Sequence, residues 1–241
     1  MLGDKNFSDI EFCEHCVFGK QKRISFGTGI HRSQGILDYI HSDLWGPASE
    51  SSLGGATYML TFIDDFSRKV WVYFLKHKSD VFSSFKYWKT MIENQTGKKI
   101  KWLRTDNGLE FCSNEFNNYC KEEGIARHRT VTYTPQQNGV AERMNKTLLE
   151  RVRCMLSDSG LPKSFWAEAA QTACFLVNRS PSSAIDFKTP EDVWTGKSPD
   201  YSYLKPFGCP VFIHVRDGKL DPRSKKGILL GYGQGVKGYR I

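Results

Sequence analysis

The chain has 241 residues, of which 39% are hydrophobic and 25% are charged, and its formal net charge is +8 with the histidines neutral. This composition is typical of a soluble globular protein with a substantial core. No run approaches the roughly 18 apolar residues of a membrane span, and no apolar signal segment follows Met1. We therefore expect neither a membrane protein nor a secreted one. The scattered cysteines favour reduced intracellular thiols over a disulfide framework.

Regular hydrophobic patterns begin only at Leu37. The predicted strands, in chain order, cover residues 37–45, 58–63, 70–75, 100–104, 126–131, 211–215 and 227–232. The predicted helices cover residues 81–96, 113–123, 140–157 and 163–178. A polar turn at 64–69 joins the second and third strands into a hairpin. Strands first, then alternating helices and strands, and then helices indicate an α/β fold, with a mixed sheet and helices on its faces.

The positive charge is concentrated toward the C-terminal end. Residues 37–158 carry 17 basic and 15 acidic side chains, whereas residues 159–241 carry 12 and 7. The excess suggests a polyanionic partner, although a net charge alone is weak evidence. The basic run within residues 218–232 could bind phosphate groups or form a solvated turn.

Three carboxylates occupy places where strand ends and a helix start can share one pocket. Asp43 lies inside the first predicted strand, Asp106 follows a strand end, and Glu142 lies in the first turn of the long helix. Carboxylates that gather in this way repel one another unless a hard divalent cation such as Mg²⁺ or Mn²⁺ neutralises them. Two such ions about 4 Å apart can clamp the attacking and leaving oxygens of a phosphodiester displacement.

The long helix turns Glu142 away from its apolar stripe. The stripe consists of Val140, Met144, Leu148, Val152 and Met155. At about 100° per residue, Glu142, Lys146 and Arg153 share the opposite, solvent-facing side. An acid flanked by bases suits a metal beside a phosphate backbone. A solvated helix face with an acid near the positive end of the helix dipole explains the same pattern.

Four ordered motifs resemble the integrases of copia-type LTR retrotransposons, members of the D-D-E integrase and transposase superfamily. The motifs are LDYIHSDLWGP at 37–47, FIDDFSR at 62–68, DNGLEF at 106–111 and TPQQNGVAERMN at 134–145. Asp106 and Glu142 are separated by 35 residues, which is the family spacing. The resemblance covers nearly the whole chain.

The resemblance implies an RNase H-like fold, that is, a mixed five-stranded sheet with flanking helices. It implies that Asp43, Asp106 and Glu142 are the catalytic triad and hold two Mg²⁺ or Mn²⁺ ions. The implied reaction transfers the ends of the element's cDNA into target DNA, as a DNA 3′-hydroxyl attacks a target phosphodiester. Implied partners are these DNAs and further copies of the chain, with no small-molecule substrate. Integration implies a nuclear location, after a cytoplasmic stage before import.

The resemblance also implies three segments: an incomplete zinc-binding segment at 1–30, the integrase catalytic core at 31–197, and a partial small β-barrel-like segment at 198–241. Cys13 and Cys16 have the spacing of zinc ligands. In the family an upstream His pair completes such a module, and residues 1–12 hold no His. We therefore expect Zn²⁺ only if upstream ligands are present in a longer protein.

Polar residues around the triad are candidates for contacts with DNA. They are Asn107, Gln137, Asn138, Lys146 and Arg153. The resemblance singles out Lys146, whereas the three amides suit an ordinary turn equally well. A second acidic pair, Asp64 and Asp65, is interpreted as a hairpin turn with local ion pairing to Arg68 and Lys69.

Two other functions remain open from the sequence. One is a catalytically inactive, truncated or domesticated fragment that retains only nucleic-acid binding. The other is hydrolysis of RNA in RNA–DNA hybrids, which the same fold class supports.

Overall fold

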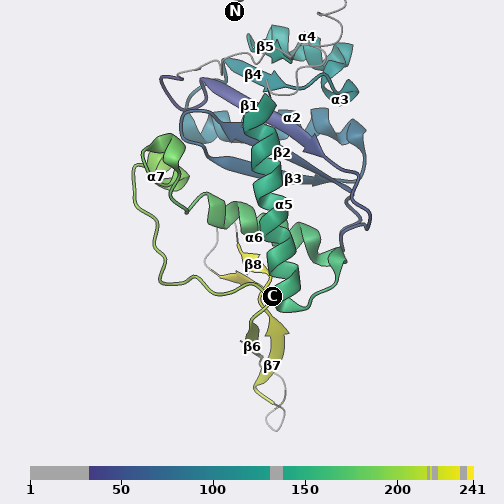
Figure 1. The fold of residues 1–241 in the computed structure, drawn as a ribbon, viewed down its shortest axis with the longest axis vertical. Helices are drawn as coiled ribbons and strands as arrows, with labels where there is room; N and C mark the ends of the chain where they lie inside the picture. Colours follow the sequence, from purple (N-terminus) through teal and green to yellow (C-terminus); the bar gives the residue numbers. More distant parts are fainter. Residues whose placement is uncertain (1–32, 131–137, 216–217, 219–221, 234–237) are drawn as a thin grey trace, which may run out of the picture. The chain divides into compact units, whose positions relative to one another are not determined.

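A computed structural model describes residues 33–130, 138–215, 218, 222–233 and 238–241 of the chain. Its central feature is a five-stranded sheet (Figure 1). The strands are β1 (Tyr39–Trp45), β2 (Tyr58–Asp64), β3 (Val70–Leu75), β4 (Trp102–Thr105) and β5 (Ala126–Arg129). Their order across the sheet is β3-β2-β1-β4-β5, so β1 lies at the centre.

The sheet is mixed, as predicted. β1 pairs antiparallel with β2 and β2 pairs antiparallel with β3, which confirms the predicted hairpin. The pairs β1–β4 and β4–β5 are parallel. Parallel neighbours require crossover connections, and helices between β3 and β4 and between β4 and β5 provide them.

Helices cover both faces of the sheet (Figure 1). They are α2 (Val81–Thr96), α3 (Leu109–Cys112), α4 (Asn114–Glu122), α5 (Gly139–Ser159), α6 (Trp166–Val177) and α7 (Pro190–Thr195). Gly97 takes the left-handed conformation, with φ 66°, and so ends α2 where the sequence predicts. Ser113 accepts a hydrogen bond from the Phe116 backbone and caps α4, also as predicted. Within the described ranges, no helix is both long and apolar enough to span a membrane.

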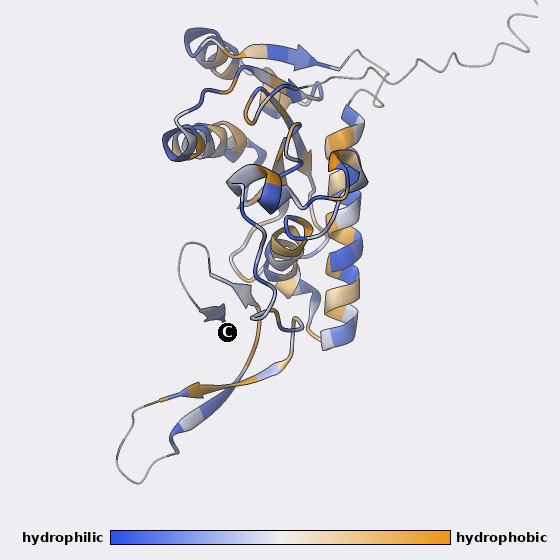
Figure 2. Ribbon diagram, turned by 90° about the vertical axis from the view of Figure 1, so that its left-hand side faces the viewer, coloured by the Kyte–Doolittle hydropathy of each residue, from blue (hydrophilic) through white to orange (hydrophobic). Residues whose placement is uncertain are grey.

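Each sheet face buries its own hydrophobic cluster, because successive strand residues point to opposite faces. Leu60 and Phe62 face α2, where the Phe62 ring stacks on Trp88 with centroids 4.2 Å apart. Met59 and Ile63 of the same strand belong to the other cluster, which α5 and α6 cover. Figure 2 shows α5 as a helix with both hydrophobic and hydrophilic residues along its length. Its apolar side therefore holds α5 against the centre of the sheet.

The turn between β2 and β3 has the local ion pairing that the sequence predicts. Arg68 lies 3.1 Å from the Asp65 carboxylate. Buried Asp64 instead accepts hydrogen bonds from the backbone N–H groups of Leu37 and Ser67. Lys69 turns outward from this local group and pairs with Glu191 of α7 at 2.7 Å. The turn therefore connects the hairpin to a distant helix as well as to itself.

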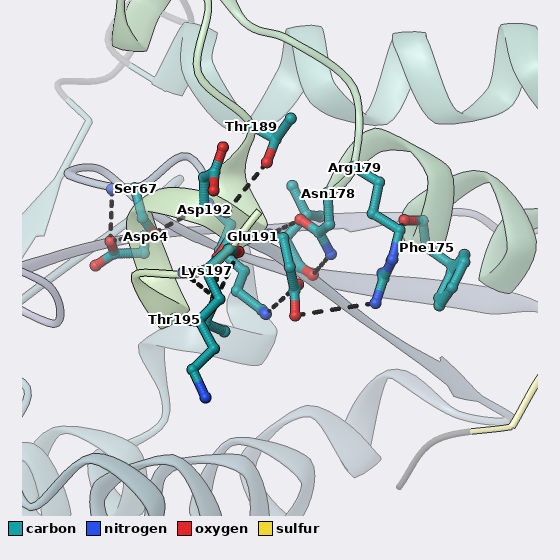
Figure 3. A network of polar contacts seen from close by, with 12 residues as sticks. Asp64, Ser67, Phe175, Asn178, Arg179, Thr189, Glu191, Asp192, Thr195 and Lys197 are labelled. Carbon is teal, nitrogen blue, oxygen red and sulfur yellow. Dashed lines mark hydrogen bonds and ion pairs between the residues drawn. The ribbon is translucent and has the colours of Figure 1, made fainter. Parts of the chain in front are cut away.

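A polar network attaches α6 and α7 to β3 (Figure 3). The Asn178 side chain, just after α6, exchanges two 2.8 Å hydrogen bonds with the backbone of Val70. Arg179 lies 3.9 Å from the second oxygen of Glu191, the partner of Lys69. α7 was not predicted, although Thr189 caps it and Pro190 occupies its first turn.

The C-terminal residues form two small antiparallel pairs. The strands are β6 (Pro210–His214), β7 (Ser224–Ile228), β8 (Gly231–Tyr232) and β9 (Tyr239–Arg240). β6 pairs with β7, and β8 pairs with β9. The single strand predicted at 227–232 is wrong, because the chain leaves β7 after Ile228 and resumes as β8 at Gly231. Lys225 and Lys226 of the basic run lie within β7, where both are exposed, and Lys219 lies outside the described residues.

Candidate active site

β1 presents Asp43 toward α5. The Asn145 side chain of α5 donates from Nδ2 to Asp43 Oδ2 at 2.8 Å. Thr61 of β2 donates its hydroxyl to the Asp43 backbone carbonyl at 3.2 Å. Burial, aided by the negative charges of Asp106 and Glu142, raises the pKa of Asp43 to about 6, although the Asn145 hydrogen bond opposes the shift. The carboxyl is therefore held in an environment that disfavours its charge.

Asp106 follows β4, the parallel neighbour of β1. His41 pairs with Arg104 in the ladder, and continuing that register two residues further places Asp106 level with Asp43. The Gly108 backbone N–H donates to Asp106 Oδ1 at 3.0 Å, which orients the carboxylate at the start of its loop. Adjacent parallel strands thus bring these two carboxylates to the same end of the sheet.

Glu142 lies in the first turn of α5 and is exposed. Lys146 and Arg153 are exposed as well, so the predicted outward side of this helix is confirmed. Partial burial and the negative charge of Asp106 raise the pKa of Glu142, while the nearby Arg143 lowers it. The negative charge of Asp106 therefore acts on both of the other acids.

The triad is brought into electrostatic contact and is not closed into a ligand shell. In the part of the chain that the structure describes, no three His, Cys, Asp or Glu side chains converge closely enough to hold a metal ion. The donor set nevertheless fits a hard divalent cation, because carboxylates offer only oxygen ligands. The buried Oδ1 of Asn145, beside Asp43, also accepts no hydrogen bond within the described residues.

The predicted contacts with DNA have different outcomes. Lys146 and Arg153 project from α5, and Asn107 is exposed although its Nδ2 donates to the Thr130 carbonyl at 2.6 Å. Asn138 has 0% exposure, and its Nδ2 donates to the Ser42 carbonyl at 3.2 Å. This placement contradicts the predicted DNA contact, because the amide is used inside the protein.

Three predicted site residues lie outside the described residues. They are Gln137, Cys13 and Cys16. The predictions of a DNA contact at Gln137 and of half a zinc site at the two cysteines stay as predictions.

Two residues that contact Asp43 or the chain on either side of Asp106 were not predicted from the sequence. Asn145 follows Glu142 by three positions and lies on the buried face of α5, beside Ala141 and Leu148. That face is rotated from the predicted apolar stripe, and a polar side chain on a buried face signals a buried partner. Arg127 of β5 donates from Nη2 to Thr105 Oγ1 and to the Phe111 carbonyl, both at 3.1 Å. These two acceptors bracket Asp106, and nothing in the local sequence pattern pointed to that contact.

A central strand with one acid, a parallel neighbour ending at a second and a covering helix that begins at a third define an RNase H-like integrase core. Comparison with known proteins agrees with this class. Residues 37–135 match the integrase core domain family, and residues 209–241 match the retroviral polymerase SH3-like domain. The chain belongs to the integrase core family found in the Pol polyproteins of copia-like transposons.

Three relatives illustrate the similarity. The Pol polyprotein from transposon TNT 1-94 of Nicotiana tabacum is 53% identical over 232 residues, which are 95% of this chain and 18% of the polyprotein. A chain of the simian T-cell lymphotropic virus intasome, solved in complex with a PP2A regulatory subunit, has 20% identity and a TM-score of 0.61 over 90% of this chain and 76% of its own. The magnesium-bound HTLV-2 integrase catalytic core has 20% identity and a TM-score of 0.50 over 67% of this chain and 99% of its own. The two solved structures share the fold.

Proposed function

We propose that this chain catalyses divalent-metal-dependent strand transfer, joining the ends of a retrotransposon's cDNA to target DNA. The observation that carries the proposal is the arrangement of three acids: Asp43 and Asp106 at the same level of two adjacent parallel strands, and Glu142 in the first turn of the helix that packs on β1. The negative charge of Asp106 raises the pKa of both of the other acids. The tobacco polyprotein and this chain share 53% identity, which supports a common activity. The chain spans less than a fifth of that relative's length, so the activity is proposed for the core alone.

In this proposal Asp43, Asp106 and Glu142 would hold Mg²⁺ or Mn²⁺, and the bound metal would supply Lewis-acid chemistry for the phosphodiester displacement. The similarity to a magnesium-bound integrase core supports Mg²⁺ as the first choice. Asn145 orients the Asp43 carboxylate, and the Gly108 N–H orients that of Asp106. This scheme needs no covalent enzyme intermediate, and the acids serve to bind the metal ions and to position them.

The remaining residues of the proposed site face the nucleic acid. Lys146 and Arg153 project from the same side of α5 as Glu142, where their charges can contact phosphates. Asn107 adjoins Asp106 and is exposed. The reaction exchanges one phosphodiester for another. The cDNA 3′-oxygen bonds to phosphorus and loses its proton to solvent, and the target 3′-oxygen leaves and takes up a proton from solvent.

We further propose that the chain acts as a homo-multimer, in the nucleus, after a cytoplasmic stage. The solved intasome and the HTLV-2 core, described as a trimeric form, support assembly by analogy. A second chain would bring a second acidic triad, which two cDNA ends require. A zinc site at Cys13 and Cys16 stays a prediction.

The test is a joining assay with labelled oligonucleotides that mimic the cDNA ends, plasmid target and Mn²⁺ or Mg²⁺. We expect joined products with either metal and none with EDTA. DNA binding without joining or cleavage would instead support the inactive-fragment alternative. Cleavage of an RNA–DNA hybrid without joining would support a ribonuclease.

A further inference from the structure

Two buried asparagines lie two helical turns apart where α5 meets β1. Asn138 precedes the first residue of α5, and Asn145 lies in its second turn. Residues seven apart on a helix lie on nearly the same face. Their side chains are 0% and 4% exposed, and the other buried residues of this face are small or apolar, such as Ala141 and Leu148.

Both amides are used as donors to consecutive residues of β1. Asn138 Nδ2 donates to the Ser42 carbonyl at 3.2 Å, and Asn145 Nδ2 donates to the Asp43 carboxylate at 2.8 Å. Carbonyl and carboxylate oxygens only accept hydrogen bonds, so neither amide can be replaced by a group that lacks an N–H or O–H. The two contacts connect one helix to one strand at two points.

The Asn138 side chain does not cap α5, although it lies at the N-cap position. An asparagine that precedes a helix normally accepts a hydrogen bond from a backbone N–H of the first turn. The Asn138 side chain makes no such cap. Both Oδ1 atoms are buried without a hydrogen bond in the described part of the chain, which is costly to stability. Apolar side chains would suit a purely structural role better.

Glu142 lies between the two asparagines, one turn after Asn138 and one turn before Asn145. From the proposed function, we infer that Asn138 and Asn145 are positioning residues: a two-point clamp that fixes Glu142 relative to Asp43. The clamp fixes the position of α5 along β1 and its rotation about the helix axis. Two acids on different elements can share a cation only if that offset is fixed to a fraction of an ångström.

The chain offers a matched control. Asn178 is also a buried asparagine, 6% exposed, that connects a helix to a strand, through the backbone of Val70 in β3. Its partner Val70 lies in β3, the strand at the opposite edge of the sheet from β5, and β3 carries no member of the triad. Asn178→Leu should therefore lower stability as much as the clamp variants do, without affecting the site.

The experiment compares Asn138→Leu, Asn145→Leu, the double variant and Asn178→Leu in the full chain. Three measurements are made: hydrogen exchange of the first turns of α5 without metal, Mn²⁺ binding by calorimetry, and joining turnover. We expect each clamp variant to speed exchange and to weaken Mn²⁺ binding and turnover about tenfold or more. Since both contacts fix one offset, the double variant should lose little more than the worse single variant. Asn178→Leu should keep wild-type binding and turnover.

Asn145→Asp is the near-isosteric companion, because it keeps the shape of the side chain and removes the N–H donor. It should speed exchange of the first turns of α5 as Asn145→Leu does, while thermal unfolding confirms that it folds. Its Mn²⁺ binding is not used as a readout, because the added carboxylate itself attracts the cation. Wild-type exchange and Mn²⁺ binding in folded clamp variants would overturn the clamp. An equal loss of Mn²⁺ binding in Asn178→Leu would also overturn it. A wild-type chain that neither binds Mn²⁺ nor joins DNA would overturn the proposed function instead. Hydrogen exchange would still test whether the two asparagines hold the first turns of α5 in place.

Discussion

Opposing effects set the pKa of Asp43. Asn145 donates a hydrogen bond to its carboxylate, while burial and the negative charges of Asp106 and Glu142 disfavour ionisation. The folded protein therefore binds a proton at Asp43 more tightly than the unfolded chain does, since the pKa rises from 3.8 to about 6. Without a cation, the ionised carboxylate lowers the stability of the fold.

Asp43→Asn should stabilise the metal-free protein at about pH 7.5 by up to about 3 kcal/mol, the value of this pKa shift at 1.36 kcal/mol per unit. Between the folded and unfolded pKa values the folded state takes up the proton first. The destabilisation is therefore present above about pH 6 and is lost as the pH falls toward 4. Urea denaturation of the wild type and Asp43→Asn at pH 7.5 and at pH 4 measures the difference in the free energy of unfolding. An equal gain in stability at both pH values would contradict the raised pKa of Asp43.

At the scale of elements, the site depends on how β5 supports the loop after β4. Arg127 of β5 donates to Thr105, immediately before Asp106, and to Phe111, at the end of the motif that follows it. Its guanidinium carbon also lies 4.5 Å from the centre of the Phe116 ring of α4. One planar side chain thus holds a strand, a loop and a helix together around the second acid.

Arg127→Lys should reduce joining about tenfold or more, because a single ammonium cannot bridge both acceptors and the Asp106 loop loses its support. The free energy of unfolding should fall by about 1–2 kcal/mol, the value of the lost hydrogen bonds. Turnover and urea denaturation measure the two effects. Arg129→Lys on the same strand is the control and should leave joining unchanged; joining by Arg127→Lys at the wild-type rate would exclude this support.

For the whole molecule, periodicity predicted the sheet and the main helices because each buries a face that repeats every two or every three to four residues. α2 is an example, with Phe85, Trp88 and Ile92 buried and Gly97 at its end. α3 and α7 were missed because each is too short to show a period. The β7–β8 break was missed because Ile228, Leu229 and Leu230 read as one continuous apolar run.

The sequence predicts the acids of the proposed site and not the residues that contact them. Asp43, Asp106 and Glu142 are proposed from their places at strand ends and a helix start, together with a family spacing. Asn138 was assigned to DNA because an exposed-looking Gln/Asn/Gly loop gives no sign that its last amide turns inward. Side-chain partners across elements depend on packing in three dimensions, which local patterns do not encode.

The most direct test of the central claim is metal-dependent joining by the wild-type chain, Asp43→Asn, Glu142→Gln and the control Glu122→Gln, an exposed acid on α4. All four proteins should remain folded by thermal unfolding. We predict that the wild type and Glu122→Gln join cDNA ends in Mn²⁺, and that the two triad variants lose about a thousandfold or more in rate. Joining at the wild-type rate by either triad variant would contradict the account.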